Sequence, residues 1–236
     1  MTNPDYWKDS LNYLTKTDKA LGNIISQFKD YSISSRGEAY ETLLRSIVGQ
    51  QISIQAASSV WNKIVELVKT IEPSKVLLTS RENLKLCGLS KQKIQYIYNI
   101  SEHFIANNIE NNAYWEGRNY LSIYEELITI KGIGPWTAEM FGMFHLLEKD
   151  IFPLKDVGII RAMNQLYNNG KKLEIDRIIE ISDTWRPYRS VACWFLWRSI
   201  DSEEVLYWDS KAITIKSPIS SVPTTLSPAA EISLVL

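Results

Sequence analysis

The chain has 236 residues, 45% of them hydrophobic, and a formal net charge of −1. This length allows one large domain or two small lobes, and the charge excludes a protein that coats nucleic acid by bulk electrostatics. Two cysteines are too few for a disulfide scaffold or a four-thiolate iron–sulfur cluster. No apolar run approaches the roughly 18 residues of a membrane span, and the polar N-terminus does not resemble a signal peptide. We therefore expect a cytoplasmic protein, or a nuclear one in a eukaryote.

Apolar residues recur at helical spacing through most of the sequence. The first clear stripe covers 40–68, with a break expected near Gly49. The further stripes cover 74–87, 90–107, 120–130, 136–147, 157–168, 174–184 and 187–199. One strand-like run, AITIKSPI at 212–219, precedes a Ser-, Pro- and Thr-rich segment at 217–236 that is expected to be a flexible tail. The pattern predicts an all-α fold.

The segment ITIKGIGPWTAEM at 128–140 predicts a helix, a tight turn and a second helix. Gly132 and Gly134 permit positive φ and close backbone approach, and Pro135 suits the first position of a helix. Ile133 is expected to fill the space between the two helices. The uncovered N–H groups and the positive end of the second helix favour an anion such as a DNA phosphate. A purely structural corner between two helices would use the same glycines.

Two later segments carry charged groups that could act on DNA. Asp156 lies in PLKDVG at the expected start of a helix, where backbone N–H groups and the helix dipole would hold its carboxylate. The alternative is an ordinary N-cap. In the segment 185–200, Arg186, Arg189 and Arg198 occur without any acidic residue, which makes it a local basic region.

Four blocks together resemble the helix-hairpin-helix DNA glycosylases, and among them the 3-methyladenine DNA glycosylase II type. They occur in the family's order as SIVGQQIS (46–53), IKGIGPWTAEMF (130–141), FPLKDVGIIRA (152–162) and WRPYRSVACWFLW (185–197). The resemblance implies two helical lobes with an active-site cleft between them. One lobe would cover 38–148 and end with the hairpin, and the other would combine 1–37 with 149–216. Some relatives have an additional N-terminal β-rich domain, for which the residues before the first block are too few.

The resemblance implies that Asp156 is the catalytic residue. Cleavage of an N-glycosidic bond builds positive charge on the sugar, and a carboxylate about 4 Å away stabilises it by a few kcal/mol at an effective dielectric constant of about 20. Bifunctional members have a nucleophilic lysine two residues after the second hairpin glycine. Here that residue is Trp136. The expected enzyme is therefore monofunctional, uses water, and leaves an abasic site.

The resemblance also implies residues that handle the damaged base. Trp136 and Trp197 match stacking positions of the alkylation-repair members, where an electron-poor base would pack on indole. Met140 stands where one of those members has a tyrosine, so the pocket should differ in shape. Gln51 matches the wedge that fills the gap left by a flipped base, and its neighbour Gln50 is the second candidate for that role. Gln50 or Gln51 could instead be a buried amide at the junction of two helices.

The remaining implied contacts are with the DNA backbone. The hairpin residues Gly132, Ile133 and Gly134 would bind phosphate. Further phosphate contacts are expected from Arg161, Arg186 and Arg189, each of which could equally be a solvated surface charge. A monovalent cation would be held by backbone carbonyls, here those of Ile128, Ile130 and Ile133. No other cofactor is expected.

The sequence therefore predicts a monomeric glycosylase that removes alkylated bases from double-stranded DNA. One rival is a glycosylase of the same fold for an oxidised or deaminated base, and Trp136 in place of lysine weakens the oxidised-base version. Another rival is a non-catalytic hairpin module that only binds the DNA backbone. That rival requires Asp156 to be dispensable, and the low net charge disfavours it.

Overall fold

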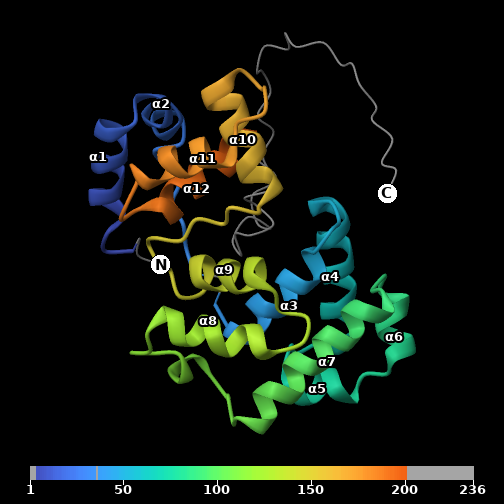
Figure 1. Cartoon of the computed structure of the whole chain (residues 1–236). Coiled ribbons are helices and arrows are strands. Elements are labelled where there is room, and N and C mark those ends of the chain that lie inside the picture. Colours follow the sequence, from blue (N-terminus) through green and yellow to red (C-terminus); the bar gives the residue numbers. More distant parts are fainter. Residues whose placement is uncertain (1–3, 36, 201–236) are drawn as a thin grey trace.

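The computed structural model describes residues 4–35 and 37–200, and within these ranges its regular structure is entirely helical. The prediction of an all-α fold is confirmed. The strand-like run at 212–219 and the predicted tail at 217–236 lie outside the described residues. The helices, drawn in Figure 1, are α1 (Trp7–Thr17), α2 (Lys19–Gln27), α3 (Ala39–Gly49), α4 (Ile54–Val68), α5 (Pro73–Leu78), α6 (Arg81–Leu86), α7 (Lys91–Ala106), α8 (Tyr120–Thr129), α9 (Pro135–Phe144), α10 (Val157–Asn168), α11 (Ile175–Asp183) and α12 (Arg189–Ile200).

Side-chain caps explain several of the helix boundaries. The expected break near Gly49 is present, and α4 restarts where the Ser53 hydroxyl accepts a hydrogen bond from the Ala56 amide at 3.3 Å. The stripe at 74–87 forms two helices rather than one, because Ser80 caps α6 and accepts from the Asn83 amide at 3.2 Å. None of the described helices is both long and apolar enough to cross a bilayer.

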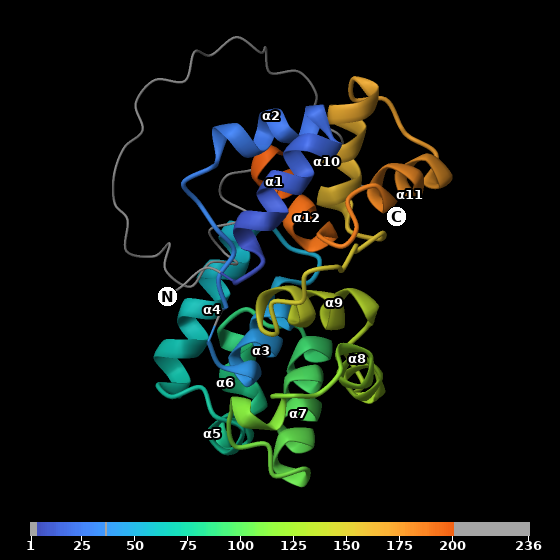
Figure 2. The ribbon, with the colours of Figure 1, turned by 90° about the vertical axis from the view of Figure 1, so that its left-hand side faces the viewer.

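Buried apolar side chains form two separate clusters. The first lies among α3–α8 and contains Leu43, Ile47, Trp61 and Ile97. The second lies among α1, α2 and α10–α12, and contains Leu14, Trp185 and Trp194. We call the two groups of helices the hairpin lobe and the aspartate lobe (Figures 1 and 2). How the chain divides into independently folding units stays a prediction.

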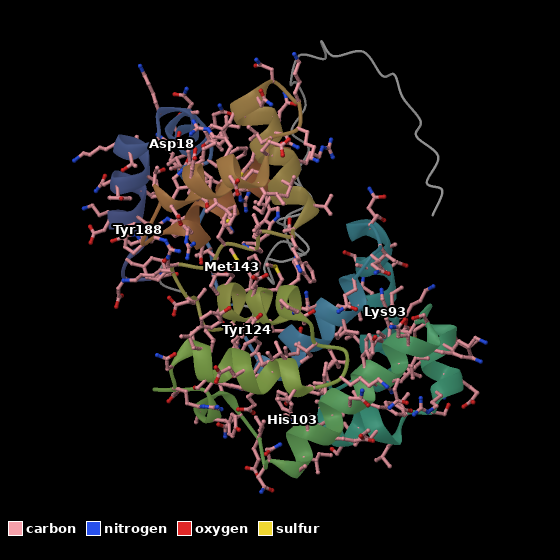
Figure 3. All side chains as sticks on the ribbon, viewed as in Figure 1. Asp18, Lys93, His103, Tyr124, Met143 and Tyr188 are labelled. Atoms are coloured by element: carbon pink, nitrogen blue, oxygen red, sulfur yellow. The ribbon has the colours of Figure 1, made fainter. Side chains whose placement is uncertain are left out.

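Helix α9 belongs to both clusters. Its Ala138 and Phe141 side chains pack in the cluster of the hairpin lobe. Met140, Met143 and Phe144 pack in the cluster of the aspartate lobe. Two views at right angles place α9 between the lobes, and Figure 3 labels Met143 at that level. Seven of its ten residues are buried, so α9 positions groups from both lobes against each other.

The first two helices had no counterpart among the predicted stripes. Asp18 caps α2, where it accepts from the Leu21 amide at 3.0 Å. Its other oxygen accepts from the Tyr167 hydroxyl at 2.6 Å and from the Trp185 indole at 2.9 Å. These hydrogen bonds fix the N-terminal helices on the aspartate lobe, where Figure 3 labels Asp18.

Candidate active site

The hairpin between α8 and α9 uses its two glycines differently. Gly132 has φ +115°, and a Cβ atom there would lie 2.2 Å from the Tyr96 ring, so both the conformation and the space require glycine. Gly134 has φ −95° and caps α9, and a Cβ atom there would meet nothing within 4 Å. The expectation of positive φ is therefore correct for Gly132 and wrong for Gly134. What Gly134 supplies is bare backbone at the N-terminus of a helix.

Ile133 is buried in the cluster of the hairpin lobe, as its expected role between the helices requires. A hydrogen bond from the Asn99 amide to the Lys131 carbonyl, at 2.7 Å, ties the turn to α7. The turn is thus anchored to α7, and a side chain at Gly134 would point into open space.

Asp156 is the N-cap of α10, as the sequence indicates. Its Oδ1 atom accepts from the Ile159 amide at 2.8 Å. The indole Nε1 of Trp197, from α12, donates to the same oxygen at 3.0 Å. The indole Nε1 of Trp136, from α9, donates to Oδ2 at 2.7 Å. Donors from three helices therefore fix this carboxylate at the junction of the lobes, where it is 9% exposed.

All three donors to Asp156 are uncharged. In residues 4–35 and 37–200, no cationic side chain lies within 4.0 Å of its carboxylate. Neutral donors stabilise an anion without cancelling its charge. The carboxylate is therefore held in place and still attracts positive charge.

Glu139 is a second acidic group close to Asp156. Its only local signal in the sequence is its place one turn after Trp136 on α9. Burial raises the pKa of Glu139 to about 7, and the charge of Asp156 adds to the rise while Lys155 opposes it. Glu139 therefore holds its proton to a higher pH than an ordinary glutamate does.

The structure brings the two predicted stacking tryptophans together at Asp156. Trp197 is 6% exposed and stacks on Phe144 with ring centroids 5.8 Å apart. Trp136 is more accessible. Met140 is fully buried in the cluster of the aspartate lobe, so its contact with a base stays a prediction. Gly158 leaves room for Asp156 and Trp197, because a Cβ atom there would come within 3.1 Å of both side chains.

The two glutamines after α3 differ in their surroundings. Gln50 is half-buried, and its amide nitrogen donates to the Thr137 hydroxyl at 3.1 Å and to the Gly132 carbonyl at 3.4 Å. This arrangement is that of a junction amide. Gln51 is exposed and has φ +57°. Of the two, only Gln51 therefore presents its side chain at the surface, and its wedge role stays a prediction.

The three predicted phosphate-binding arginines also differ. Arg189 donates to Asp150 at 2.7 Å and 3.2 Å, and Arg186 donates to Asp150 at 2.8 Å and to Asp183 at 3.0 Å. Both guanidinium groups are engaged within the protein, and their phosphate contacts stay predictions. Arg161 is exposed on α10, the helix that Asp156 caps.

The carbonyls predicted to hold a monovalent cation lie at the end of α8 and in the turn. The Ile130 carbonyl accepts from the Ile133 amide at 2.9 Å and keeps a second lone pair. Neutral carbonyl oxygens, such as those of Ile128, Ile130 and Ile133, are ligands that a hard cation prefers. Its binding stays a prediction.

A cavity of about 380 Å³ lies at the other end of α9, beside the segments that connect the lobes. Ser35, Trp115, Arg118 and His145 are among its lining residues. His145 donates from Nδ1 to the Gly37 carbonyl at 3.0 Å, and burial lowers its pKa to about 4. None of the predicted site residues lines this cavity.

Comparison with known proteins identifies the family of this chain. The HhH-GPD superfamily base excision DNA repair protein model matches residues 44–187, more than half of the chain. DNA-3-methyladenine glycosylase 1 of Schizosaccharomyces pombe is 27% identical over 80% of this chain and 84% of its own. DNA-3-methyladenine glycosylase of Bacillus subtilis is 28% identical over 81% of this chain and 69% of its own.

Solved structures give the same result. The S. pombe 3-methyladenine DNA glycosylase in complex with abasic DNA superposes with a TM-score of 0.74 at 26% identity, covering 83% of this chain and 98% of that one. A DNA-3-methyladenine glycosidase from Bacillus halodurans superposes with a TM-score of 0.68 at 30% identity, covering 90% and 99%. The chain therefore belongs to the HhH-GPD superfamily of base excision DNA repair proteins.

Proposed function

We propose that this protein hydrolyses the N-glycosidic bond of alkylated bases, of the 3-methyladenine type, in double-stranded DNA and leaves an abasic site. The observation that carries the proposal is the Asp156 carboxylate, fixed by three uncharged donors at the junction of the lobes. We propose that it acts as a monomer. It would act in the compartment that contains the genome, which is the cytoplasm of a bacterium or the nucleus of a eukaryote.

Departure of the base leaves positive charge on the sugar. A carboxylate about 4 Å from that charge stabilises it by about 4 kcal/mol at an effective dielectric constant of about 20. Asp156 can also orient the attacking water or accept its proton. An alkylated base already carries positive charge and leaves neutral, so its departure needs less assistance.

Trp136 determines how the reaction ends. Its indole cannot attack a sugar carbon, so no Schiff base forms at this position and the strand stays intact. The face of the same ring can stack on the flipped base, while its N–H group holds Asp156. Gln51 would fill the gap in the duplex, and the bare backbone at Gly134 would bind phosphate.

The test compares wild-type protein with Asp156→Asn and, as a control with the same charge change, Asp176→Asn at an exposed position of α11. Each is incubated with methylated duplex DNA, and the free bases are identified by mass spectrometry. We expect Asp156→Asn to lose base release by about 10²–10³-fold and to keep its affinity for an abasic duplex. Wild-type rates in Asp156→Asn would refute the assigned role. A second duplex that contains uracil or 8-oxoguanine is tested in parallel. Release from that duplex with the methylated DNA left intact would refute the substrate, and DNA binding without any release would indicate a binding module.

A further inference from the structure

Lys93 occupies a position at which its charge is locally unfavourable. It is the third residue of α7, whose N-cap is Ser90. The first turn of a helix favours acidic residues, because the helix dipole is positive there. Burial also lowers the pKa of Lys93, so its ammonium group has lost part of its hydration. A lysine at such a position suggests a compensating interaction elsewhere.

The compensating interaction is with the end of another helix. The Lys93 ammonium donates to the Val48 carbonyl at 2.8 Å and to the Gln50 carbonyl at 2.6 Å. These carbonyls belong to the last turn and the C-cap of α3, where helix carbonyls lack partners and the dipole is negative. Figure 3 labels Lys93 where α3, α4 and α7 meet. No carboxylate lies within 4.0 Å of it among the residues described.

These contacts surround the loop that carries Gln51. On one side, Gln50 is held through its carbonyl by Lys93 and through its side chain by Thr137. On the other side, Ser53 caps α4. Gln51 itself has φ +57°, a left-handed conformation that costs on the order of 1 kcal/mol for a residue other than glycine. Such a conformation persists only where neighbouring contacts fix the chain.

We propose that Lys93 is a positioning residue that holds the Gln51 loop in the shape required for its side chain to enter the DNA duplex. The inference rests on the proposed function, because it assumes that Gln51 fills the gap left by the flipped base. Lys93 touches neither the base nor the sugar in this assignment. It fixes the backbone carbonyl that directly precedes Gln51, so its loss should slow base flipping and leave the chemistry at Asp156 unchanged.

The test is a double-mutant cycle with Lys93→Met and Gln51→Ala, measured as single-turnover base release from a duplex with one methylated adenine. We expect Lys93→Met to slow release about tenfold in wild-type protein and less than twofold in the Gln51→Ala background. Lys93→Arg, which keeps charge and donors, should restore most of the rate. Lys91→Met, an exposed neighbour with the same charge change, should match wild type.

A fluorescent base beside the lesion reports flipping directly, and its signal should rise more slowly with Lys93→Met. If Lys93→Met does not fold, Lys93→Gln replaces it with the same expected pattern. A wild-type rate of base release in Lys93→Met would overturn the inference. So would a Lys93→Met substitution that slows release equally in wild-type protein and in the Gln51→Ala background. Failure of the proposed function would look different, because wild-type protein would then release no methylated base.

Discussion

Two carboxylates of the segment between α9 and α10 lie six residues apart and have opposite surroundings. Asp150 is paired with two arginines, Arg189 at 2.7 Å and Arg186 at 2.8 Å. Asp156 accepts from an amide and two indoles, all of them uncharged. The negative charge of Asp150 is therefore neutralised by neighbouring arginines, whereas no neighbouring cation neutralises that of Asp156 among the residues described.

The difference shows how donor type separates an acid whose charge is neutralised within the fold from one whose charge is not. An ion pair couples an acid to stability, because removing either partner leaves a charge without compensation. Neutral donors fix an acid equally well in space but do not cancel its field. Substitutions of the two acids and of their donors should therefore separate stability from base release.

The largest expected effect on stability belongs to Asp150→Asn. It leaves two guanidinium groups beside a neutral amide, and the Arg189 side chain is only 15% exposed. We expect the free energy of unfolding to fall by about 2–4 kcal/mol, less than the roughly 3–5 kcal/mol for buried pairs, because these side chains retain some solvent and Asp183 still pairs with both arginines. Asp156→Asn keeps the cap at Oδ1 but turns an amide nitrogen, which cannot accept, toward the Trp136 indole, so we expect a smaller loss of about 1–2 kcal/mol. Urea unfolding measures both.

The variants Asp150→Asn and Asp156→Asn should show the reverse order in their loss of base release. Asp150→Asn, assayed at a temperature where it is folded, should retain the wild-type single-turnover rate. Equal loss of stability in the two variants would remove the distinction between them.

A second contrast lies in the hairpin. Gly132→Ala combines φ +115° with a Cβ atom 2.2 Å from the Tyr96 ring, so we expect a loss of about 2–3 kcal/mol in the free energy of unfolding. Gly134→Ala meets nothing within 4 Å and should leave stability almost unchanged. If Gly134 faces phosphate, its alanine variant should instead weaken binding to an abasic duplex. Thermal unfolding and fluorescence anisotropy separate the effects, and a stability loss at Gly134 would contradict the assignment.

The indole donors to Asp156 can be removed one at a time. Trp136→Phe and Trp197→Phe keep an aromatic ring and lose the N–H group. Because hydrogen bonds to charged groups contribute about 1.5–3 kcal/mol, we expect the rate of base release at saturating protein to fall about tenfold or more in each. An effect confined to DNA affinity, with the saturated rate unchanged, would mean that these rings only stack on the base.

The smallest expected effect concerns Glu139. Its pKa is raised to about 7 in the folded protein, so the folded state keeps a proton that the unfolded state has already lost. The stability that this provides is present below about pH 4.5 and disappears as the pH rises through about 7. Glu139→Gln should therefore gain about 1–2 kcal/mol relative to wild type between about pH 5 and pH 8, after allowance for solvent screening.

Glu125→Gln on the exposed face of α8 is the matched control for this measurement, and should show no such trend. Urea midpoints at the two pH values give the comparison. A difference between wild type and Glu139→Gln that does not depend on pH would show that Asp156 and burial leave Glu139 unaffected.

Local signals in the sequence predicted much of the fold. The stripe at 157–168 coincides with α10, and the residue before it, Asp156, is its cap. Both features depend on neighbours a few residues away, and periodicity and capping report such neighbours directly. Helices α1 and α2 were not identified, and Asp18 depends on Tyr167 and Trp185, more than 140 residues away in the chain.

The site shows the same limit. The sequence indicated Asp156, Trp136 and Trp197 separately, but their hydrogen bonds span 20 and 41 residues and follow only from how α9 and α12 pack. The pairing of Arg189 with Asp150 spans 39 residues and was equally invisible. Lys93 has one local signal in the sequence, because it is a basic residue in the first turn of a helix, where acidic residues are favoured.

The membership of α9 in both apolar clusters has a practical consequence for dissecting this molecule. A fragment that ends before α9 would lose Ala138 and Phe141 from the cluster that also contains Leu127 and Ile133. A fragment that begins after it would uncover the other cluster where Met143 and Phe144 pack. Neither fragment should therefore fold into a soluble protein when it is expressed alone. Thermal unfolding of the intact chain should show a single transition for both lobes.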